Sequence, residues 1–273
     1  LINNNQMAKK LAREAGSKKN KYYKNKKFFD EEQETSTEID LLANSFKHST
    51  KMKNSLSMDE PFKWTDKQLE LIKTMSDYRS KAVFVEGPAG TGKSVCAMFS
   101  ALQLLNKDKI EKIIYIRSVV ESSYSHLGYL PGDKKSKVEE WFQTAFEACS
   151  NFVAEPELRE LEESGKIEFA PIGFLRGRNF KNCVIIVEEC QNIYYKELLT
   201  ILTRCADNCK IFLMGDSHQT DIKISGEFER VYSKLLDEKA QEYGIHFRRF
   251  DVSDIKRSEL VKFLVERLEI YGK

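Results

Sequence analysis

Short apolar runs alternate with amphipathic stretches along the chain from about residue 61 onward. The runs are rich in β-branched residues and predict strands over residues 83–86, 113–117, 167–170, 184–188 and 211–214, with a weaker strand over 245–250. Between them, apolar residues recur at helical spacing and predict helices over residues 67–75, 93–106, 138–152, 194–204, 227–236 and 258–271. This alternation is typical of an α/β fold, with a mostly parallel sheet flanked by helices on both faces.

The last predicted helix carries its apolar residues on one stripe, formed by Leu260, Val261, Leu264, Val265 and Leu268. Such a stripe is typical of a helix that packs against the core. We therefore expect this helix to be buried along one side.

The N-terminal part differs from the rest of the chain in its distribution of charge. Residues 1–27 hold nine lysine or arginine residues and one glutamate, whereas residues 28–40 hold six acidic residues and no basic one. Charge blocks of this kind indicate a flexible arm over residues 1–60, followed by one folded domain over residues 61–273. The arm has two interpretations, a segment without a role or a tether for nucleic acid or another acidic partner, and nearby aromatic residues favour the tether slightly.

Overall composition excludes some classes of protein. A net charge of +2 gives no general argument for a nucleic-acid partner. No run of about 18 apolar residues occurs and the N-terminus lacks an apolar segment, so we expect a cytoplasmic protein without a membrane partner. The six cysteines are scattered without a C-x-x-C pair, which predicts reduced core residues. Only Cys205 and Cys209 could be neighbours on a helical face, and a metal site there would need further ligands.

The strand predicted over residues 83–86 runs directly into a loop with the pattern G-x-x-x-x-G-K-[ST]. Glycines let successive backbone N–H groups turn toward an anion, and the following helix presents its positive end to that anion. In this pattern Lys93 bridges the terminal phosphates of ATP, and the Ser94 hydroxyl is a ligand of Mg²⁺. A glycine-rich turn without a ligand is the alternative, which the strand–loop–helix context disfavours. The expected ATP-binding residues of this P-loop are Gly87, Pro88, Ala89, Gly90, Thr91, Gly92, Lys93 and Ser94.

Polar residues also follow two other predicted strands. The apolar run at residues 184–187 ends in Glu188 and Glu189, and the run at 211–214 leads to Asp216 and Gln219. We expect Glu188 to hold the metal, Glu189 to orient and deprotonate the attacking water, and Gln219 with Asp216 to sense the γ-phosphate. A turn-capping role is the alternative for Asp216.

Taken in order, these motifs resemble the PhoH-like P-loop ATPase family from about residue 62 to the C-terminus. The resemblance is carried by the P-loop, by Arg117 with Glu121, and by residues 127–133, 176–178, 189–192, 202–204 and 215–221. It implies a RecA-like core related to superfamily 1 helicases, ATPase activity and a tendency to form homo-oligomeric rings. It also implies a role in RNA metabolism, with RNA or single-stranded nucleic acid as the partner. Thr65 and Gln68 stand where that group places its adenine-reading glutamine, so Gln68 is an expected nucleotide ligand.

The chain departs from the family at one position. The family usually ends the metal strand with Asp-Glu, and here Glu188 takes the place of the aspartate. A longer side chain suits a water-mediated metal contact better than a direct one, and slow turnover is therefore expected. Some relatives carry a preceding nuclease domain, which the short and charged residues 1–60 do not resemble.

Superfamily 1 helicases also read ATP with an arginine from a second RecA-like domain, and the 52 residues after Asp221 are too few for such a domain. The candidate arginines are Arg176, Arg178, Arg204 and Arg257, of which the resemblance favours Arg257. If the arginine reaches a neighbouring subunit, the active species is an oligomer, in particular a ring.

Two function classes remain open on sequence. The first is a ring-forming ATPase that acts on RNA or single-stranded nucleic acid, with RNA helicase activity as one form of it. The second is a nucleotide-dependent switch or binding protein without helicase activity. The expected phosphate-backbone contacts of a nucleic acid are Arg176, Arg178, Lys134, Lys135 and Lys137.

Overall fold

Six parallel strands form one sheet in the order β3-β2-β4-β5-β1-β6. The computed structural model describes residues 56–118, 143–172, 177–206, 208–217, 219 and 226–267. The strands are β1 (Ala82–Glu86), β2 (Lys112–Arg117), β3 (Ile167–Pro171), β4 (Cys183–Glu188), β5 (Cys209–Gly215) and β6 (Ile245–Arg249).

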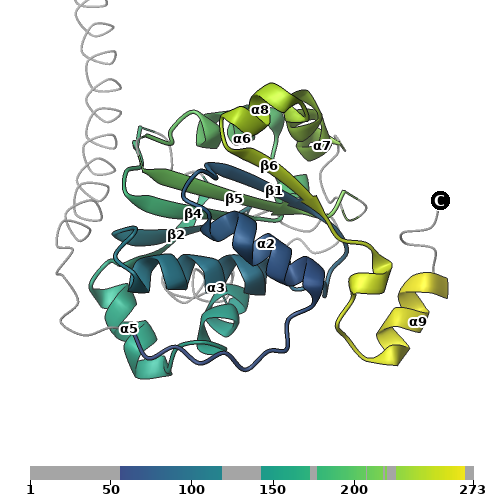
Figure 1. Cartoon of the computed structure of the whole chain (residues 1–273), viewed down its shortest axis with the longest axis horizontal. Coiled ribbons are helices and arrows are strands. Elements are labelled where there is room, and N and C mark those ends of the chain that lie inside the picture. The colour runs from purple at the N-terminus through teal and green to yellow at the C-terminus, as the bar shows by residue number, and fades with distance from the viewer. Residues whose placement is uncertain are drawn as a thin grey trace, which may run out of the picture. The chain divides into compact units, whose positions relative to one another are not determined.

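Most of the helices lie between consecutive strands, and helices cover both faces of the sheet (Figure 1). They are α2 (Asp66–Ser76), α3 (Lys93–Asn106), α5 (Glu155–Glu163), α6 (Tyr195–Leu202), α7 (Glu227–Tyr232), α8 (Glu238–Glu242) and α9 (Glu259–Arg267). Residues 143–150 are also helical, and 3₁₀ turns lie at η2 (Cys190–Asn192), η3 (Ser233–Leu235) and η4 (Val252–Asp254).

Alternating residues of each central strand enter two separate cores. In β1, Val83 and Val85 pack with α2, α3, α5 and the helix at residues 143–150, whereas Ala82 and Phe84 pack with α6 and α7. Every residue of β1, β4 and β5 is buried, because helices cover the sheet on both sides. The fold is α/β and RecA-like, as expected, and the six strand predictions are confirmed.

The helix predictions are less accurate. The expected helix over residues 227–236 ends as α7 at Tyr232 and continues as the 3₁₀ turn η3. The sequence pattern missed α5, which buries only Leu158 and Leu161, and the five-residue α8. Both are too short or too charged to show an apolar stripe. Residues 138–142 and 268–271 of two predicted helices lie outside the described residues.

The expectation that α9 is buried along one side is wrong for two of the stripe residues that the structure describes, and a third, Val261, is half-buried. Leu260 is 65% exposed and Leu264 is 43% exposed, and the neighbouring Phe263 is 52% exposed. Figure 1 shows the reason, because α9 lies beyond the two helical layers rather than against a face of the sheet. Amphipathic spacing predicts a helix, but it does not predict what covers the apolar side.

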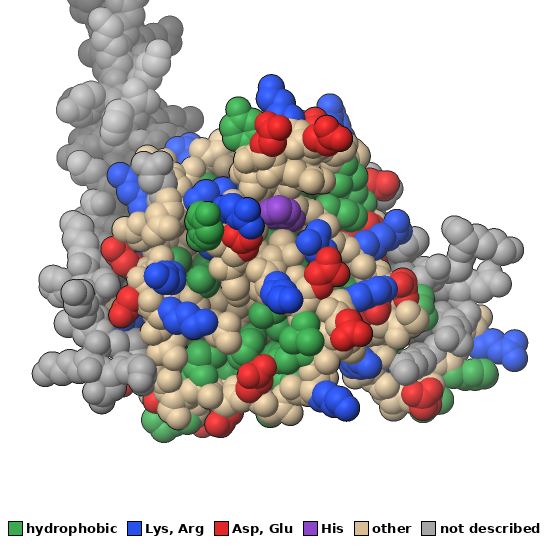
Figure 2. Space-filling view, in the orientation of Figure 1, with side chains coloured by type: hydrophobic (Ala, Val, Ile, Leu, Met, Phe, Trp, Pro, Cys, Tyr) green, Lys and Arg blue, Asp and Glu red, His purple; other side chains and the backbone are tan. Residues whose placement is uncertain are grey.

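The structure also bears on where the packed part of the chain begins, on the cysteines and on membrane spans. Leu56 is buried and its backbone pairs with the Asn106 side chain, so the packed part of the chain extends to the N-terminal side of residue 61. The six cysteines are free and five are buried, as expected. Cys205 and Cys209 do not share a helical face, because Cys209 begins β5, where its Sγ lies 3.6 Å from that of Cys183. Across the described ranges, the helices are too short or too polar to span a membrane. On the face shown in Figure 2, basic and acidic side chains are interspersed.

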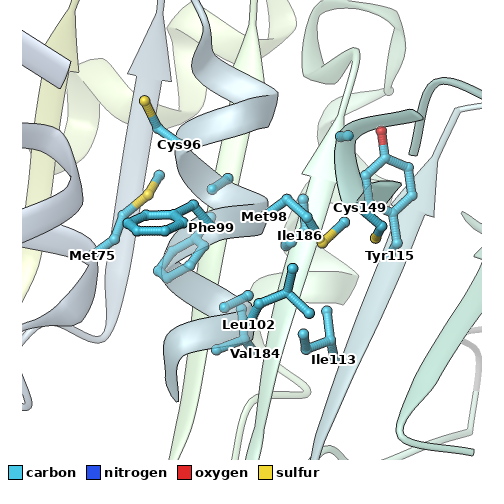
Figure 3. Packing of buried hydrophobic residues seen from close by; sticks show 14 of the residues in the cluster. Met75, Cys96, Met98, Phe99, Leu102, Ile113, Tyr115, Cys149, Val184 and Ile186 are labelled. Atoms are coloured by element: carbon cyan, nitrogen blue, oxygen red, sulfur yellow. The ribbon is translucent and has the colours of Figure 1, made fainter. Parts of the chain in front are cut away.

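Leu102 offers a direct test of the core between α3 and the sheet. Its side chain points from α3 toward Ile113 and Val184 (Figure 3) and is fully buried. Leu102→Ala is expected to lower the free energy of unfolding by about 2 to 5 kcal/mol, because it removes buried methyl groups and leaves a cavity. Urea denaturation measures this loss. The matched control is Leu199→Ala at a 47% exposed position, which should change stability by less than about 1 kcal/mol. Equal losses in the two variants would contradict the packing.

Candidate nucleotide-binding site

The loop between β1 and α3 bends sharply at two glycines. Gly90 has a φ of 84° and Gly92 a φ of 85°, in the left-handed region that other residues rarely adopt. A Cβ on Gly92 would also lie only 2.7 Å from Nε2 of Gln68. α3 then begins at Lys93, and the N–H groups of its first turn are available to an anion.

Lys93 folds back onto this loop. Its Nζ donates to the carbonyl oxygens of Gly87 at 2.6 Å and Pro88 at 2.8 Å. Burial lowers the pKa of Lys93, while the charges of Glu188, Asp216 and Glu189 act in the opposite direction. The ends of β4 and β5 therefore share one electrostatic environment with the P-loop lysine.

Two segments hold the P-loop from outside the cavity. Gln68 of α2 donates from Nε2 to the carbonyl oxygen of Thr91 at 3.0 Å, and its Oε1 accepts from the Thr65 backbone at 3.0 Å. After β6, the Lys256 backbone N–H donates to the carbonyl oxygen of Gly90 at 2.9 Å. A Cβ on Gly90 would lie 2.9 Å from Nε of Arg257. The conformation of the loop thus depends on contacts with residues far away in sequence.

An ion-pair cluster joins these two segments. Lys67 Nζ lies 2.8 Å from a carboxylate oxygen of Asp251 and 2.7 Å from one of Asp254. The hydrogen bond from Lys67 lowers the pKa of Asp251 to about 2, with a further contribution from Ser253. The cluster is partly exposed, so it adds little to the free energy of unfolding. Its effect is to fix the turn before Arg257.

Glu188 ends β4 as a buried carboxylate. Burial raises its pKa to about 7, although a hydrogen bond from Ser94 and the charge of Lys93 lower it. Its Oε1 is buried and has no hydrogen-bond partner among the described residues. A buried oxygen without a partner beside a serine hydroxyl suits a hard cation such as Mg²⁺, which prefers oxygen ligands. Ser94 and Glu188 therefore fit the metal role expected from the sequence.

Glu189 follows in a left-handed backbone conformation, with a φ of 55°. Its Oε2 accepts a hydrogen bond from Nε2 of Gln191 at 2.7 Å, and its Oε1 lies 3.8 Å from Nη2 of Arg117. Arg117 ends β2 and is the register partner of Glu188. Side chains from β2 and η2 thus orient the Glu189 carboxylate at the cavity.

Asp216 and Gln219 follow β5 at the same edge. The Gln219 backbone N–H donates to the carbonyl oxygen of Asp216 at 3.0 Å, which closes a turn. Asp216 is buried and Gln219 is exposed, and both line the cavity. Residues 218 and 220–225 lie outside the described residues.

The cavity has a volume of about 340 Å³. One wall is the P-loop with the start of α3, a second is formed by the ends of β4 and β5, and a third comes from residues 144–151. The residues expected from sequence that line it are Ala89, Gly90, Gly92, Lys93, Ser94, Glu188, Glu189, Asp216, Gln219 and Arg257. The sequence interpretation missed the third wall, formed by Thr144, Glu147, Ala148 and Asn151, because no motif marks it.

Other expected site residues lie away from the cavity. Gly87, Pro88 and Thr91 belong to the loop without lining the cavity. Gln68 supports the loop through Nε2 alone, because its Oε1 accepts from the Thr65 backbone N–H at the start of its own helix. Direct contact of Gln68 with adenine thus stays a prediction.

Two of the candidate arginines are at the wrong end of the sheet. Arg178 pairs with the buried carboxylate of Glu168 near the start of β3, and the Arg204 carbonyl oxygen accepts from the Phe180 backbone before β4 begins. Both therefore lie near the amino ends of the parallel strands, whereas the P-loop lies at the carboxyl ends. Arg176 and the lysines at 134, 135 and 137 lie outside the described residues.

In the comparison with known proteins, the family model and the related sequences all carry the same family name. The family described as "PhoH-like protein" matches residues 63–269. A PhoH-like protein of Synechocystis is 32% identical over 205 residues, covering 75% of this chain and 61% of its own length. A PhoH-like protein of Bacillus subtilis is 33% identical over 199 residues, with 73% and 61% coverage. Protein PhoH of Escherichia coli K12 is 30% identical over 199 residues, with 71% and 54% coverage. The chain thus spans about 61% or less of the length of these relatives.

Solved structures include a more distant match. The large terminase of a thermophilic bacteriophage aligns with a TM-score of 0.49 and 13% sequence identity, covering 76% of this chain and 50% of the terminase.

The raised pKa of Glu188 makes a prediction about stability and pH. Its pKa is about 7 in the folded protein against the usual 4.5, so the folded state retains a proton that the unfolded state has released between these values. Without metal or nucleotide, the unsubstituted chain should lose stability relative to Glu188→Gln as pH rises through this window. The difference should approach about 3 kcal/mol near pH 8 and nearly vanish near pH 4.5. Urea unfolding of both proteins in a chelator measures it, and a difference that does not grow with pH would rule out the raised pKa.

Proposed function

Since the chain belongs to the family of PhoH-like proteins, we propose that it binds ATP with Mg²⁺ in the cavity above the P-loop and hydrolyses it. One observation carries this proposal. The P-loop lysine, a buried carboxylate whose Oε1 has no partner in the described part of the chain, and a second carboxylate line one cavity. A phosphate loop alone accounts for binding, whereas these two carboxylates also provide for hydrolysis.

Lys93 and the start of α3 would bind the phosphates. On binding, Nζ of Lys93 exchanges the carbonyl oxygens of Gly87 and Pro88 for oxygens of the β- and γ-phosphates. Ser94 and Glu188 would hold Mg²⁺, which supplies charge neutralisation and orientation of the phosphate oxygens when bound. The phosphates also bring negative charge to a lysine that burial otherwise destabilises as a cation.

Glu189 would act on water. Its carboxylate lines the cavity beside Glu188 and is oriented by Gln191 and Arg117. There it can accept a hydrogen bond from a water molecule aligned with the γ-phosphate and take its proton as the water attacks. Gln219 and Asp216, on the turn after β5, would contact the γ-phosphate or this water and respond to its release.

Arg257 would provide positive charge near the transferred phosphate. It lines the cavity of its own chain and packs against Gly90. A second subunit is therefore not required to bring this arginine to the site, in contrast to the arrangement in trans considered from the sequence. A positive charge there would stabilise the charge that develops on the phosphate oxygens.

We further propose that the protein forms a homo-oligomeric ring and acts on RNA or single-stranded nucleic acid. The exposed Leu260, Phe263 and Leu264 on α9 support an oligomer, because they give a second copy an apolar surface directly after Arg257. The nucleic-acid part is supported by the family resemblance.

The roles of the two glutamates can be separated by substitution. Glu189→Gln is expected to lower ATP turnover by about a hundredfold or more with little change in nucleotide affinity, because the amide cannot take a proton from water. Glu188→Asp should keep or raise turnover, since a carboxylate remains on the metal side. Steady-state phosphate release and binding of a fluorescent ATP analogue measure both quantities. Glu163→Gln, at an exposed position on α5, is the control. Equal loss of turnover in Glu188→Asp and Glu189→Gln would contradict this division of roles.

The nucleic-acid and ring proposals predict how turnover responds to RNA and what mass the protein has in solution. ATP hydrolysis by the full chain should rise severalfold with single-stranded RNA, and light scattering should give the mass of a closed oligomer. A salt-dependent RNA affinity is expected because phosphate contacts release counterions. Turnover that is unchanged by RNA would favour a nucleotide-dependent switch without helicase activity. A monomeric mass at all protein concentrations, with and without ATP, would refute the ring.

A further inference from the structure

Gln191 connects two parts of the site that are far apart in sequence. Its side chain is only 4% exposed although it is polar. Nε2 donates to Oε2 of Glu189 at 2.7 Å, and Oε1 accepts from the Asp216 backbone N–H at 3.0 Å. The amide therefore bridges the carboxylate after β4 and the backbone after β5.

The orientation of this amide is determined by its surroundings. A backbone N–H can only donate, so the atom facing Asp216 has to be the amide oxygen. The NH₂ group is then directed to Glu189, whose carboxylate accepts. The close packing depends on Gly215, because a Cβ there would lie 3.2 Å from Oε1 of Gln191 and 2.8 Å from the ring of Phe228. Gly215 thus permits the amide to reach the end of β5.

Glu189 depends on this contact more than on its other described partner. Its hydrogen bond with Gln191 is 2.7 Å long, whereas Nη2 of Arg117 is 3.8 Å away on a side chain that is 31% exposed. A short bond from a buried neutral donor restricts the carboxylate more than a long, partly solvated ion pair does. Glu189 also has a left-handed backbone, which its neighbours have to maintain.

We propose that Gln191 is a positioning residue for ATP hydrolysis, which holds the Glu189 carboxylate toward the attacking water and ties its position to the backbone at Asp216. This inference rests on the proposed function. Because the turn after β5 contains Asp216 and Gln219, which line the cavity, a shift of that turn on phosphate binding or release moves the amide and with it the carboxylate. Gln191 also lines the cavity, and its proposed effect on hydrolysis acts through Glu189.

Two substitutions separate the halves of the bridge. Gln191→Leu removes both hydrogen bonds at similar volume, whereas Gln191→Glu keeps an acceptor for the Asp216 N–H but offers Glu189 no permanent donor. Both should lower kcat by about ten- to hundredfold, while KM and the affinity for a fluorescent ATP analogue stay within about twofold. A purely structural amide would lower stability without this selective effect on kcat.

Asn106 provides the matched control. Its amide also makes two hydrogen bonds, accepting from the Leu56 N–H at 2.7 Å and donating to the Leu56 carbonyl oxygen at 3.2 Å, but it lies at the far end of α3. Asn106→Leu should lower the thermal unfolding temperature and leave kcat within about twofold, when turnover is measured well below that temperature.

The outcomes separate this inference from the proposed function. Absence of ATP turnover in the unsubstituted chain, with and without RNA, would overturn both. Normal turnover in the unsubstituted chain together with an unchanged kcat in Gln191→Glu would overturn the inference alone. The same holds if nucleotide affinity falls as much as kcat, or if Asn106→Leu loses as much kcat as Gln191→Leu.

Discussion

Parallel pairing of β1, β5 and β4 is the constraint on which the whole site depends. Val85 lies in register with Met214, and Val187 lies in register with Leu213. The residues that follow these strands therefore emerge at one edge of the sheet, as expected for parallel α/β folds. The P-loop, the two glutamates and the Asp216 turn meet there although more than a hundred residues separate the first from the last. Without β5 between β1 and β4, the Asp216 backbone N–H would not lie beside the Gln191 amide.

Charge burial follows from this arrangement. The site brings Lys93 of α3 and the carboxylates at the ends of β4 and β5 to one cavity, and burial disfavours the charged form of both Lys93 and Glu188. In isolation this is a cost to the fold, and it is offset by the surrounding layers, with both faces of the central strands packed against helices. Such a site is suited to a ligand that carries both negative charge and a cation, because that ligand supplies the partners that the protein groups lack.

Local patterns in the sequence were sufficient for the strands, for the P-loop and for the acidic residues after β4. Each signal spans a few neighbouring residues: an apolar run, a glycine spacing or two adjacent glutamates. The same patterns did not show that the apolar stripe of α9 is exposed at Leu260 and Leu264, or that Arg178, one of four candidate arginines, pairs with Glu168 away from the cavity. In both cases the pattern identified the type of residue but not the residues that it would contact in the fold.

The sequence by itself determined which segments form strands, where a phosphate could bind, and which family the chain resembles, because these properties depend on periodicity and on residues adjacent in the chain. Only the tertiary structure decided that Gln68 and Lys256 hold the P-loop, that Arg257 reaches the cavity of its own chain, and that Gln191 bridges Glu189 and Asp216. These contacts join segments whose proximity depends on strand order and on the path of the connections. A linear pattern of apolar and polar residues contains no direct record of either.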